Sequence, residues 1–209
     1  ALMVYDNNNS ATTSGFDNLF DNGASIVGLW KFFTEFGCRP GSHLFLGTWS
    51  SGEYTSLDSS GWSFVPGVGI IAPVESGSWS LTYILEQNLW ADPCNKKRSI
   101  GLLSEWGIAD RTTNPYEWVA NVALQGQGLI AGREQDTMGA AYFYSGLSGD
   151  FKDLLDPRLP VDDLQGVELY YNAAITPWFH LTTDLQFVEP AVSANDTAVV
   201  LGLRGNIKL

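Results

Sequence analysis

The feature that most constrains the fold is a strict alternation of apolar and polar side chains near the end of the chain. In residues 167–175 every odd-numbered side chain is apolar or aromatic, whereas the even-numbered positions include Glu168 and Asn172. The alternation continues through 178–187, and only residues 176–177 separate the two runs. A period of two places successive side chains on opposite faces of a β-strand. The two runs therefore predict antiparallel strands joined by a tight hairpin.

The same period recurs along the whole chain and predicts about ten strands. No Gly-rich linker or change of composition divides the sequence, so residues 1–209 are expected to form one all-β unit. The expected strands lie at residues 1–6, 25–36, 43–51, 78–91, 99–110, 117–128, 136–146, 166–175, 178–187 and 196–208.

The connections between these strands alternate in length. Short turns at one end and long loops at the other are typical of an outer-membrane barrel, whose short turns face the periplasm. A soluble sandwich has no physical reason to sort its loops by end. Short connections are expected at 37–42, 92–98, 129–135 and 176–177, long ones at 7–24, 52–77, 147–165 and 188–195, and one short link, 111–116, in a long-loop position.

The composition is compatible with a membrane barrel and argues against other classes. Hydrophobic residues make up 44% and aromatic residues 13% of the chain. The longest run without a charge, 59–74, is broken by Pro and Gly, so no membrane-spanning helix is expected. A net charge of -12 would repel a phosphate backbone, so nucleic acid is not an expected partner. Metal-ligand and phosphate-binding motifs are missing from the sequence, so neither metal nor cofactor is expected.

The two faces of several expected strands fit the wall of a barrel. In 117–128, Trp118 and Val122 lie on one face, whereas Asn121 and Gln125 lie on the other. The apolar face would contact lipid and the polar face would line water. We therefore expect an all-β fold, an antiparallel transmembrane β-barrel.

The alternative is a soluble β-sandwich that binds carbohydrate or hydrolyses glycosidic bonds, because acidic, aromatic-rich β-proteins include both. A glycosidase needs two carboxylates that flank the scissile bond. Glu86, Glu105 and Glu168 are available, but no two lie in a paired motif on one strand. A Gly-x-Ser-x-Gly motif is also missing, and the chain has two His. We expect no catalytic residue and no enzyme.

Nearly the whole chain carries a series of short sequence motifs, and the order of these motifs along the chain is informative. Each is weakly specific alone, but together they resemble carbohydrate-selective porins of the OprB type, with the match falling on the C-terminal half of that family. The motifs are Gly-Val-Glu-Leu-Tyr-Tyr-Asn at 166–172, Ile-Thr-Pro-Trp at 175–178, Thr-Asp-Leu-Gln-Phe-Val at 183–188 and Ala-Val-Val-Leu-Gly-Leu-Arg at 198–204, preceded by segments at 15–20, 78–87, 107–115 and 132–144.

The resemblance implies a barrel of the outer-membrane porin type and a passive, carbohydrate-selective channel for small sugars. Its barrels have about 16 strands, so the ten strands here would form the C-terminal portion, and N-terminal strands are expected to be absent from the sequence. The alternative is a shortened relative with a narrower barrel. The implied location is the bacterial outer membrane. The implied partners are small sugars, outer-membrane lipid and the missing half of the barrel, while the oligomeric state stays open.

A channel needs no catalytic group. It needs a hydrated wall whose width, charge and hydrogen-bonding groups suit its solute. Aromatic rings, for which Trp49, Trp90 and Tyr170 are candidates, would stack on pyranose faces, and Arg204 would need an acidic partner, Glu168 or Asp184. The strand parity gives these candidates for pore lining or solute contact: Lys31, Glu35, Glu86, Asn88, Glu105, Asn121, Gln125, Glu168, Tyr170, Asn172, His180, Asp184, Gln186 and Arg204.

Two further pairs of residues lie in expected periplasmic turns. Cys38 and Cys94 are candidates for a disulfide, with two free thiols as the equally supported alternative. Arg133 and Asp136 share the motif Gly-Arg-Glu-Gln-Asp, and we expect them to form a structural clasp rather than to contact solute.

Overall fold

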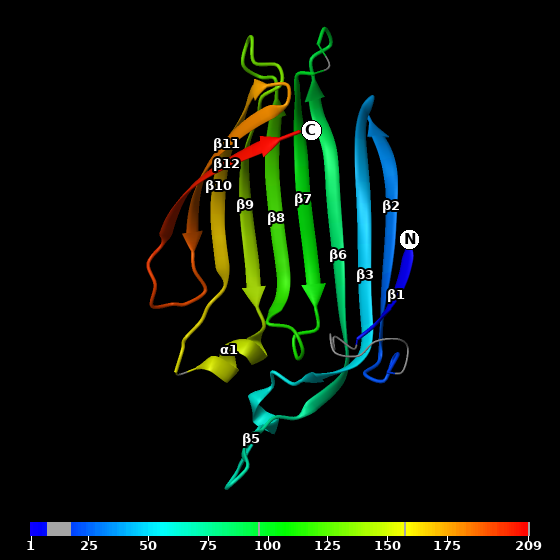
Figure 1. Ribbon diagram of the computed structural model, residues 1–209, viewed down its shortest axis with the longest axis vertical. Coiled ribbons are helices and arrows are strands. Elements are labelled where there is room, and N and C mark those ends of the chain that lie inside the picture. Colours follow the sequence, from blue (N-terminus) through cyan, green and yellow to red (C-terminus); the bar gives the residue numbers. More distant parts are fainter. Residues whose placement is uncertain (8–17, 96, 157, 209) are drawn as a thin grey trace.

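Ten strands form one antiparallel sheet in the computed structural model, which describes residues 1–7, 18–95, 97–156 and 158–208 (Figure 1). Each strand pairs with the next in the order β1-β2-β3-β6-β7-β8-β9-β10-β11-β12. The strands predicted from the period of two are confirmed, with bounds shifted by a few residues. They are β1 (Leu2–Asp6), β2 (Ala24–Phe36), β3 (Arg39–Thr55), β6 (Val74–Ala91), β7 (Ser99–Ala109), β8 (Tyr116–Gln127), β9 (Thr137–Leu147), β10 (Leu164–Thr176), β11 (Phe179–Glu189) and β12 (Ala198–Ile207).

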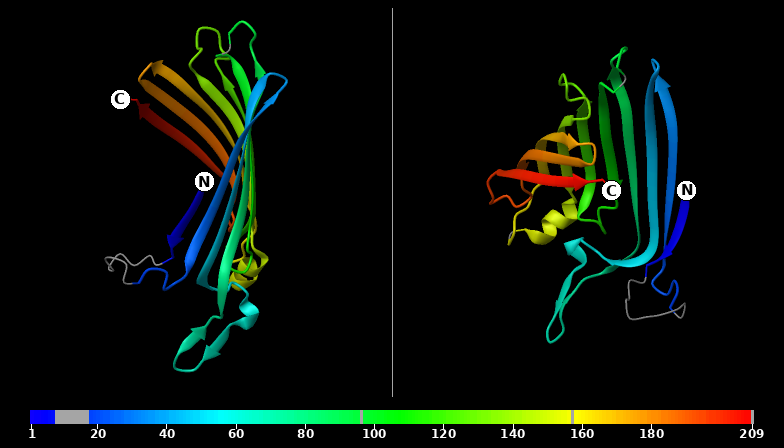
Figure 2. Two further views of the ribbon diagram at one scale, coloured as in Figure 1. Left: turned by 90° about the vertical axis from the view of Figure 1, so that its right-hand side faces the viewer. Right: turned by 45° about the horizontal axis from the view of Figure 1, so that its top comes forward.

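The sheet is curved and open. Figure 2 shows that β1 and β12 both bend toward the same side of the central strands. Within the described residues, β1 pairs only with β2 and β12 only with β11, so each keeps one edge without a strand partner. The sheet is therefore the wall of a barrel that these ten strands do not close.

The connections are sorted by length as the sequence predicted. Short turns join β2 to β3, β6 to β7, β8 to β9 and β10 to β11 at one end, and the long loops gather at the other (Figure 1). The long loops contain elements that the period of two did not predict. These are the 3₁₀-helix η1 (Ser59–Gly61), the hairpin β4 (Ser63–Val65) to β5 (Gly69–Ile71), and α1 (Gly149–Leu155).

The register divides the sheet into an apolar face and a polar face. On the apolar face, Trp30 is 68% exposed and Leu201 is 81% exposed. Val27 and Leu147 are the only hydrophobic side chains of the described residues that are buried. A soluble protein of this size buries a substantial core, and large exposed apolar patches mark interaction surfaces. The apolar side chains of this sheet must therefore be covered by something outside the chain.

No helix in the described ranges is long and apolar enough to cross a membrane.

Cys38 and Cys94 are both free and exposed, so the disulfide candidate is wrong. Cys38 lies in the β2–β3 turn and Cys94 in the β6–β7 turn. Neighbouring turns of this kind are centred about two strand spacings apart, roughly 10 Å, whereas a disulfide needs Cα atoms within about 7 Å. Gly37 and Cys38 have φ values of 58° and 60°, as a two-residue hairpin turn of type I′ requires, and the turn therefore holds its shape without a bond.

Candidate pore wall

The polar candidates chosen from strand parity all lie on one face of the sheet. The register links them in rows, for example Glu105 with Asn121, Gln125 with Gly139 and Tyr170, and Tyr170 with Asp184. Candidates on one strand are an even number of residues apart and so share a face. The residues brought onto this polar face are Lys31, Glu35, Glu86, Asn88, Glu105, Asn121, Gln125, Glu168, Tyr170, Asn172, His180, Asp184, Gln186 and Arg204.

Several of these side chains are held by neighbours on other strands of the sheet. Asn121 Nδ2 donates to Glu105 Oε2 at 2.8 Å. Ser42 Oγ donates to Glu86 Oε2 at 2.8 Å, and Lys31 Nζ lies 3.8 Å from the same oxygen. These contacts fix carboxylates of the wall in place while leaving them accessible, since the Glu86 side chain is 59% exposed.

A second polar group lies toward the short-turn ends of β10 and β11. His180 Nδ1 is 2.9 Å from Asn172 Oδ1, and Asn172 Nδ2 donates to Thr182 Oγ1 at 2.6 Å. Thr182 is buried and was not among the predicted candidates. It could have been found from its position between His180 and Asp184, since all three share one face.

The expected acidic partner of Arg204 is not observed. Among the described residues no ion pair joins Arg204 to Glu168 or Asp184, so that prediction is wrong. The register places Arg204 opposite Thr182 and Asp184 opposite Gly202. The Asp184 carboxylate lies over Gly202, where a Cβ would collide with it. Arg204 is exposed on the edge strand β12, and its guanidinium is open to groups beyond the sheet.

Trp49 and Trp90, predicted as stacking candidates, lie on the apolar face instead. Trp49 is the register partner of Trp79 and Ile26. Trp90 pairs with Ile100 because the register shifts between Asn88 and Trp90, which moves the indole to the other side of the sheet. Of the three predicted rings, the register leaves only Tyr170 on the polar face.

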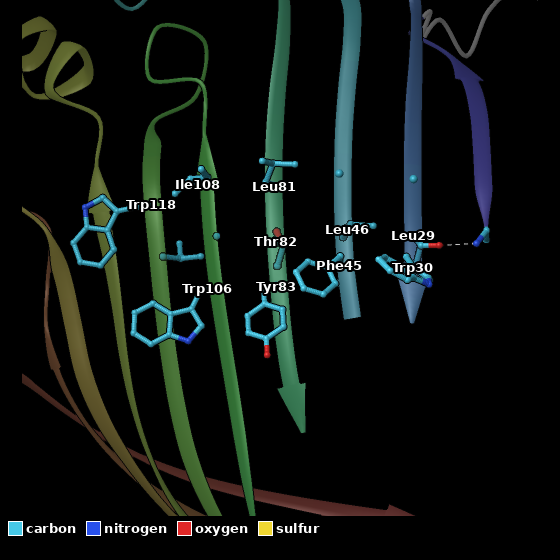
Figure 3. Close-up of a pocket in the computed structure, with 15 residues that line it drawn as sticks. Leu29, Trp30, Phe45, Leu46, Leu81, Thr82, Tyr83, Trp106, Ile108 and Trp118 are labelled. Carbon is cyan, nitrogen blue, oxygen red and sulfur yellow. Dashed lines mark hydrogen bonds between the residues drawn. The ribbon is translucent and has the colours of Figure 1, made fainter. Parts of the chain in front are cut away.

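The apolar face contains a groove of about 790 Å³ whose lining includes several aromatic rings. Figure 3 shows Trp30, Phe45, Tyr83 and Trp106 in a row beside it, with Trp118 beyond. Gly28 and Gly47 form part of its floor, because neither places a side chain there. A belt of exposed rings is typical of the interfacial girdle of a membrane barrel.

The predicted clasp between Arg133 and Asp136 is confirmed. Arg133 Nε donates to Asp136 Oδ2 at 2.7 Å, Ala174 N donates to Asp136 Oδ1 at 2.9 Å, and the Tyr171 hydroxyl also donates to this carboxylate. Burial opposes ionisation, but these hydrogen bonds outweigh it, so the pKa of Asp136 lies below its usual value. The β8–β9 turn is thereby tied to β10.

The long-loop end has its own ionic cluster around α1. Lys152 Nζ lies 2.6 Å from Asp163 Oδ1 and 3.1 Å from Asp162 Oδ1, and Arg111 Nη2 lies 2.8 Å from Asp150 Oδ1. Burial opposes the charge of Lys152, but the hydrogen bonds to Asp163 and Asp162 prevail and raise the pKa of Lys152. The Arg111–Asp150 pair holds the loop between β9 and β10 against the link between β7 and β8, whereas the pairs of Lys152 lie within that loop.

The described residues contain no group of three or more His, Cys, Asp or Glu side chains placed to hold a metal ion.

Comparisons with known proteins agree with this geometry. The sequence model of the family described as carbohydrate-selective porin, OprB family, matches residues 3–209. The fold is similar to that of OprB from Pseudomonas putida in its high-pH structure, with a TM-score of 0.80 and 20% sequence identity. The match covers 89% of this chain and 49% of that chain, so the chain spans about half the length of this solved relative. None of the curated proteins compared with the sequence matches it.

Proposed function

The chain belongs to the carbohydrate-selective porin family named OprB, and from this premise we propose that its sheet is part of the wall of a water-filled channel through which small sugars diffuse passively across the bacterial outer membrane. The family and the fold indicate a channel rather than an enzyme. The observation that carries the proposal is the division of one curved sheet into a polar face and an exposed apolar face.

The proposed channel needs more strands than these ten. A sheet edge without a strand partner would place backbone N–H and C=O groups in hydrocarbon, where each costs several kcal/mol. The free edges of β1 and β12 bend toward the same side, as the ends of a barrel segment do (Figure 2). We infer that further strands, matching the other half of the solved relative's length, join these edges. The intact mass of the natural protein tests this inference.

The chemistry of the polar face suits neutral, hydroxyl-rich solutes. Acidic side chains outnumber basic ones, but they are spread over several strands and interleaved with Asn, Gln and Tyr. Amide and carboxylate oxygens accept hydrogen bonds from sugar hydroxyls, and amide nitrogens donate to them. A pore that favours anions requires rings of Lys or Arg. Lys31 and Arg204 are the basic residues among the pore candidates, and they lie far apart, on β2 and β12.

Liposome swelling tests the proposed passage of sugars. We expect liposomes that contain the native protein to swell in isosmotic glucose faster than in an isosmotic disaccharide, because a wall of fixed polar side chains admits small neutral solutes more readily. Retarded migration of the boiled protein relative to the unboiled protein on a gel serves as the control for a folded barrel. Swelling no faster than that of protein-free liposomes would contradict the proposal, as would recovery of the protein as a soluble monomer without detergent.

A further inference from the structure

Two aromatic rings on the polar face each lie over a glycine of the neighbouring strand. Tyr170 of β10 is the register partner of Gly139 of β9, and Phe143 of β9 is the partner of Gly166 of β10. A Cβ at Gly139 would lie 2.5 Å from Tyr170 Cε1 and 2.9 Å from Tyr170 Cζ, and one at Gly166 would collide with Phe143 Cζ. Both rings therefore occupy space that only glycine leaves free.

The hydroxyl of Tyr170 shows how its ring is oriented. Tyr170 Oη donates to Gln125 Oε1 at 2.6 Å. Gln125 of β8 is the register partner of Gly139, so the hydrogen bond joins β10 to β8 across the intervening β9. A side chain that spans one strand in this way must lie flat over it. One face of the ring then contacts the backbone at Gly139, and the other faces away from the sheet.

A carboxylate lies between the two rings. Glu168 pairs with Ala141, in the row between the Phe143–Gly166 pair and the Gly139–Tyr170 pair. The two rows of rings are four residues apart, about 13 Å along the strands. The structure gives Glu168 no hydrogen-bond or ion-pair partner within the described ranges, and its side chain is partly exposed. The next two residues of this row, Ala141 on β9 and Ala123 on β8, both have small side chains.

We propose that Phe143 and Tyr170 are stacking platforms for neutral pyranose rings, with Glu168 between them as an acceptor for sugar hydroxyls. This inference rests on the proposed function and names a binding site within it. The face of an aromatic ring presents a broad apolar surface to the C–H groups of a pyranose, and a free carboxylate accepts charge-assisted hydrogen bonds from hydroxyls. From the long-loop end to the short-turn end, a sugar would meet Phe143, then Glu168, then Tyr170.

The rings of the apolar face do not offer this combination. Trp30, Phe45, Tyr83 and Trp106 lie beside a groove lined by hydrophobic side chains and glycine (Figure 3). Phe143 was missed in the sequence because its role depends on Gly166, a residue 23 positions away that only the strand register places opposite it. The polar face thus differs from the apolar face in pairing flat rings with a free acceptor.

Block of single-channel current by sugar in planar bilayers tests the proposal with the native protein. We expect Phe143→Leu and Tyr170→Leu each to raise the half-saturating glucose concentration about fivefold, the loss of one stacking contact. Tyr170→Phe keeps the ring and should stay within about twofold of the wild type. Tyr142→Leu removes a neighbouring ring on the apolar face and should leave the block unchanged. Sorbitol, a linear hexitol without a ring, should block all variants alike.

The outcomes separate this inference from the proposed function. If glucose does not block the wild type, both are wrong. If glucose blocks the wild type but Phe143→Leu and Tyr170→Leu remain within twofold of it, with unchanged sugar-free conductance, only the stacking platforms are wrong. If one Leu variant does not fold, the other decides, because block within twofold of the wild type there would contradict stacking. A weakening of about fivefold in Tyr170→Phe would also contradict it, because the effect would then belong to the hydroxyl rather than to the ring face.

Discussion

Asp136→Ala is expected to lower the free energy of unfolding by about 3 kcal/mol, because it removes three hydrogen bonds to a buried carboxylate. Asp136 is 3% exposed and accepts from Arg133, Ala174 N–H and Tyr171. The measurement is urea unfolding of the native protein from lipid vesicles. Glu134→Ala, in the same turn but exposed, is the matched control and should change the free energy by less than about 0.5 kcal/mol. Equal changes in the free energy of unfolding for the two variants would contradict the stabilising role of the Arg133–Asp136 clasp.

The clasp also predicts a pH dependence. The pKa of Asp136 is depressed in the folded protein, so its contribution to stability is complete above the unfolded pKa of about 4. It is lost as the pH falls through the lower, folded value. Asp136→Asn cannot titrate and should lack this part of the dependence below about pH 4. A stability profile that is identical in wild type and Asp136→Asn over this acidic range would show that the carboxylate is not held in its charged form.

Val122→Arg is expected to lower the free energy of unfolding from a bilayer by about 2 to 4 kcal/mol, because Arg on the lipid face is costly near the membrane midplane. Val122 lies near the middle of β8 on the apolar face and is 38% exposed. Its neighbour Ala123 lies on the polar face, between Leu103 and Ala141. Ala123→Arg should cost less than about 1 kcal/mol and change conductance instead. The reverse order of the two effects would mean that the faces are assigned the wrong way round.

The alternation of side chains predicted most of the sheet because it is a local pattern repeated along every strand. The hairpin of β10 and β11 is an example, since Glu168 and Gln186 are register partners and share the polar face as their parity required. The turn itself lies at 177–178 rather than at the predicted 176–177, with a register shift between Ala174 and Thr176. Most of the polar face followed from the same parity. Trp90 did not, because the register shift after Asn88 moves it to the other face without any change in the local pattern. A shift of this kind depends on the neighbouring strand.

Features that depend on residues far apart in the chain could not be predicted from the sequence. The unpaired state of Cys38 and Cys94 reflects the spacing between turns, and the exposed position of Arg204 reflects its place on an edge strand. The cluster around α1 depends on Lys152 meeting Asp163 across the loop. The motif at 15–20 falls partly outside the described residues. In contrast, the Arg133–Asp136 clasp was predictable because both residues lie within one short turn.

Titration of the single-channel current of the native protein with glucose and, separately, with phosphate decides whether this wall serves neutral sugars. We expect partial block by glucose, altered when Glu168 or Arg204 is replaced by Ala, and little block by phosphate, because the polar face carries more acidic than basic side chains. A current that is indifferent to glucose but strongly blocked by phosphate would contradict the carbohydrate assignment.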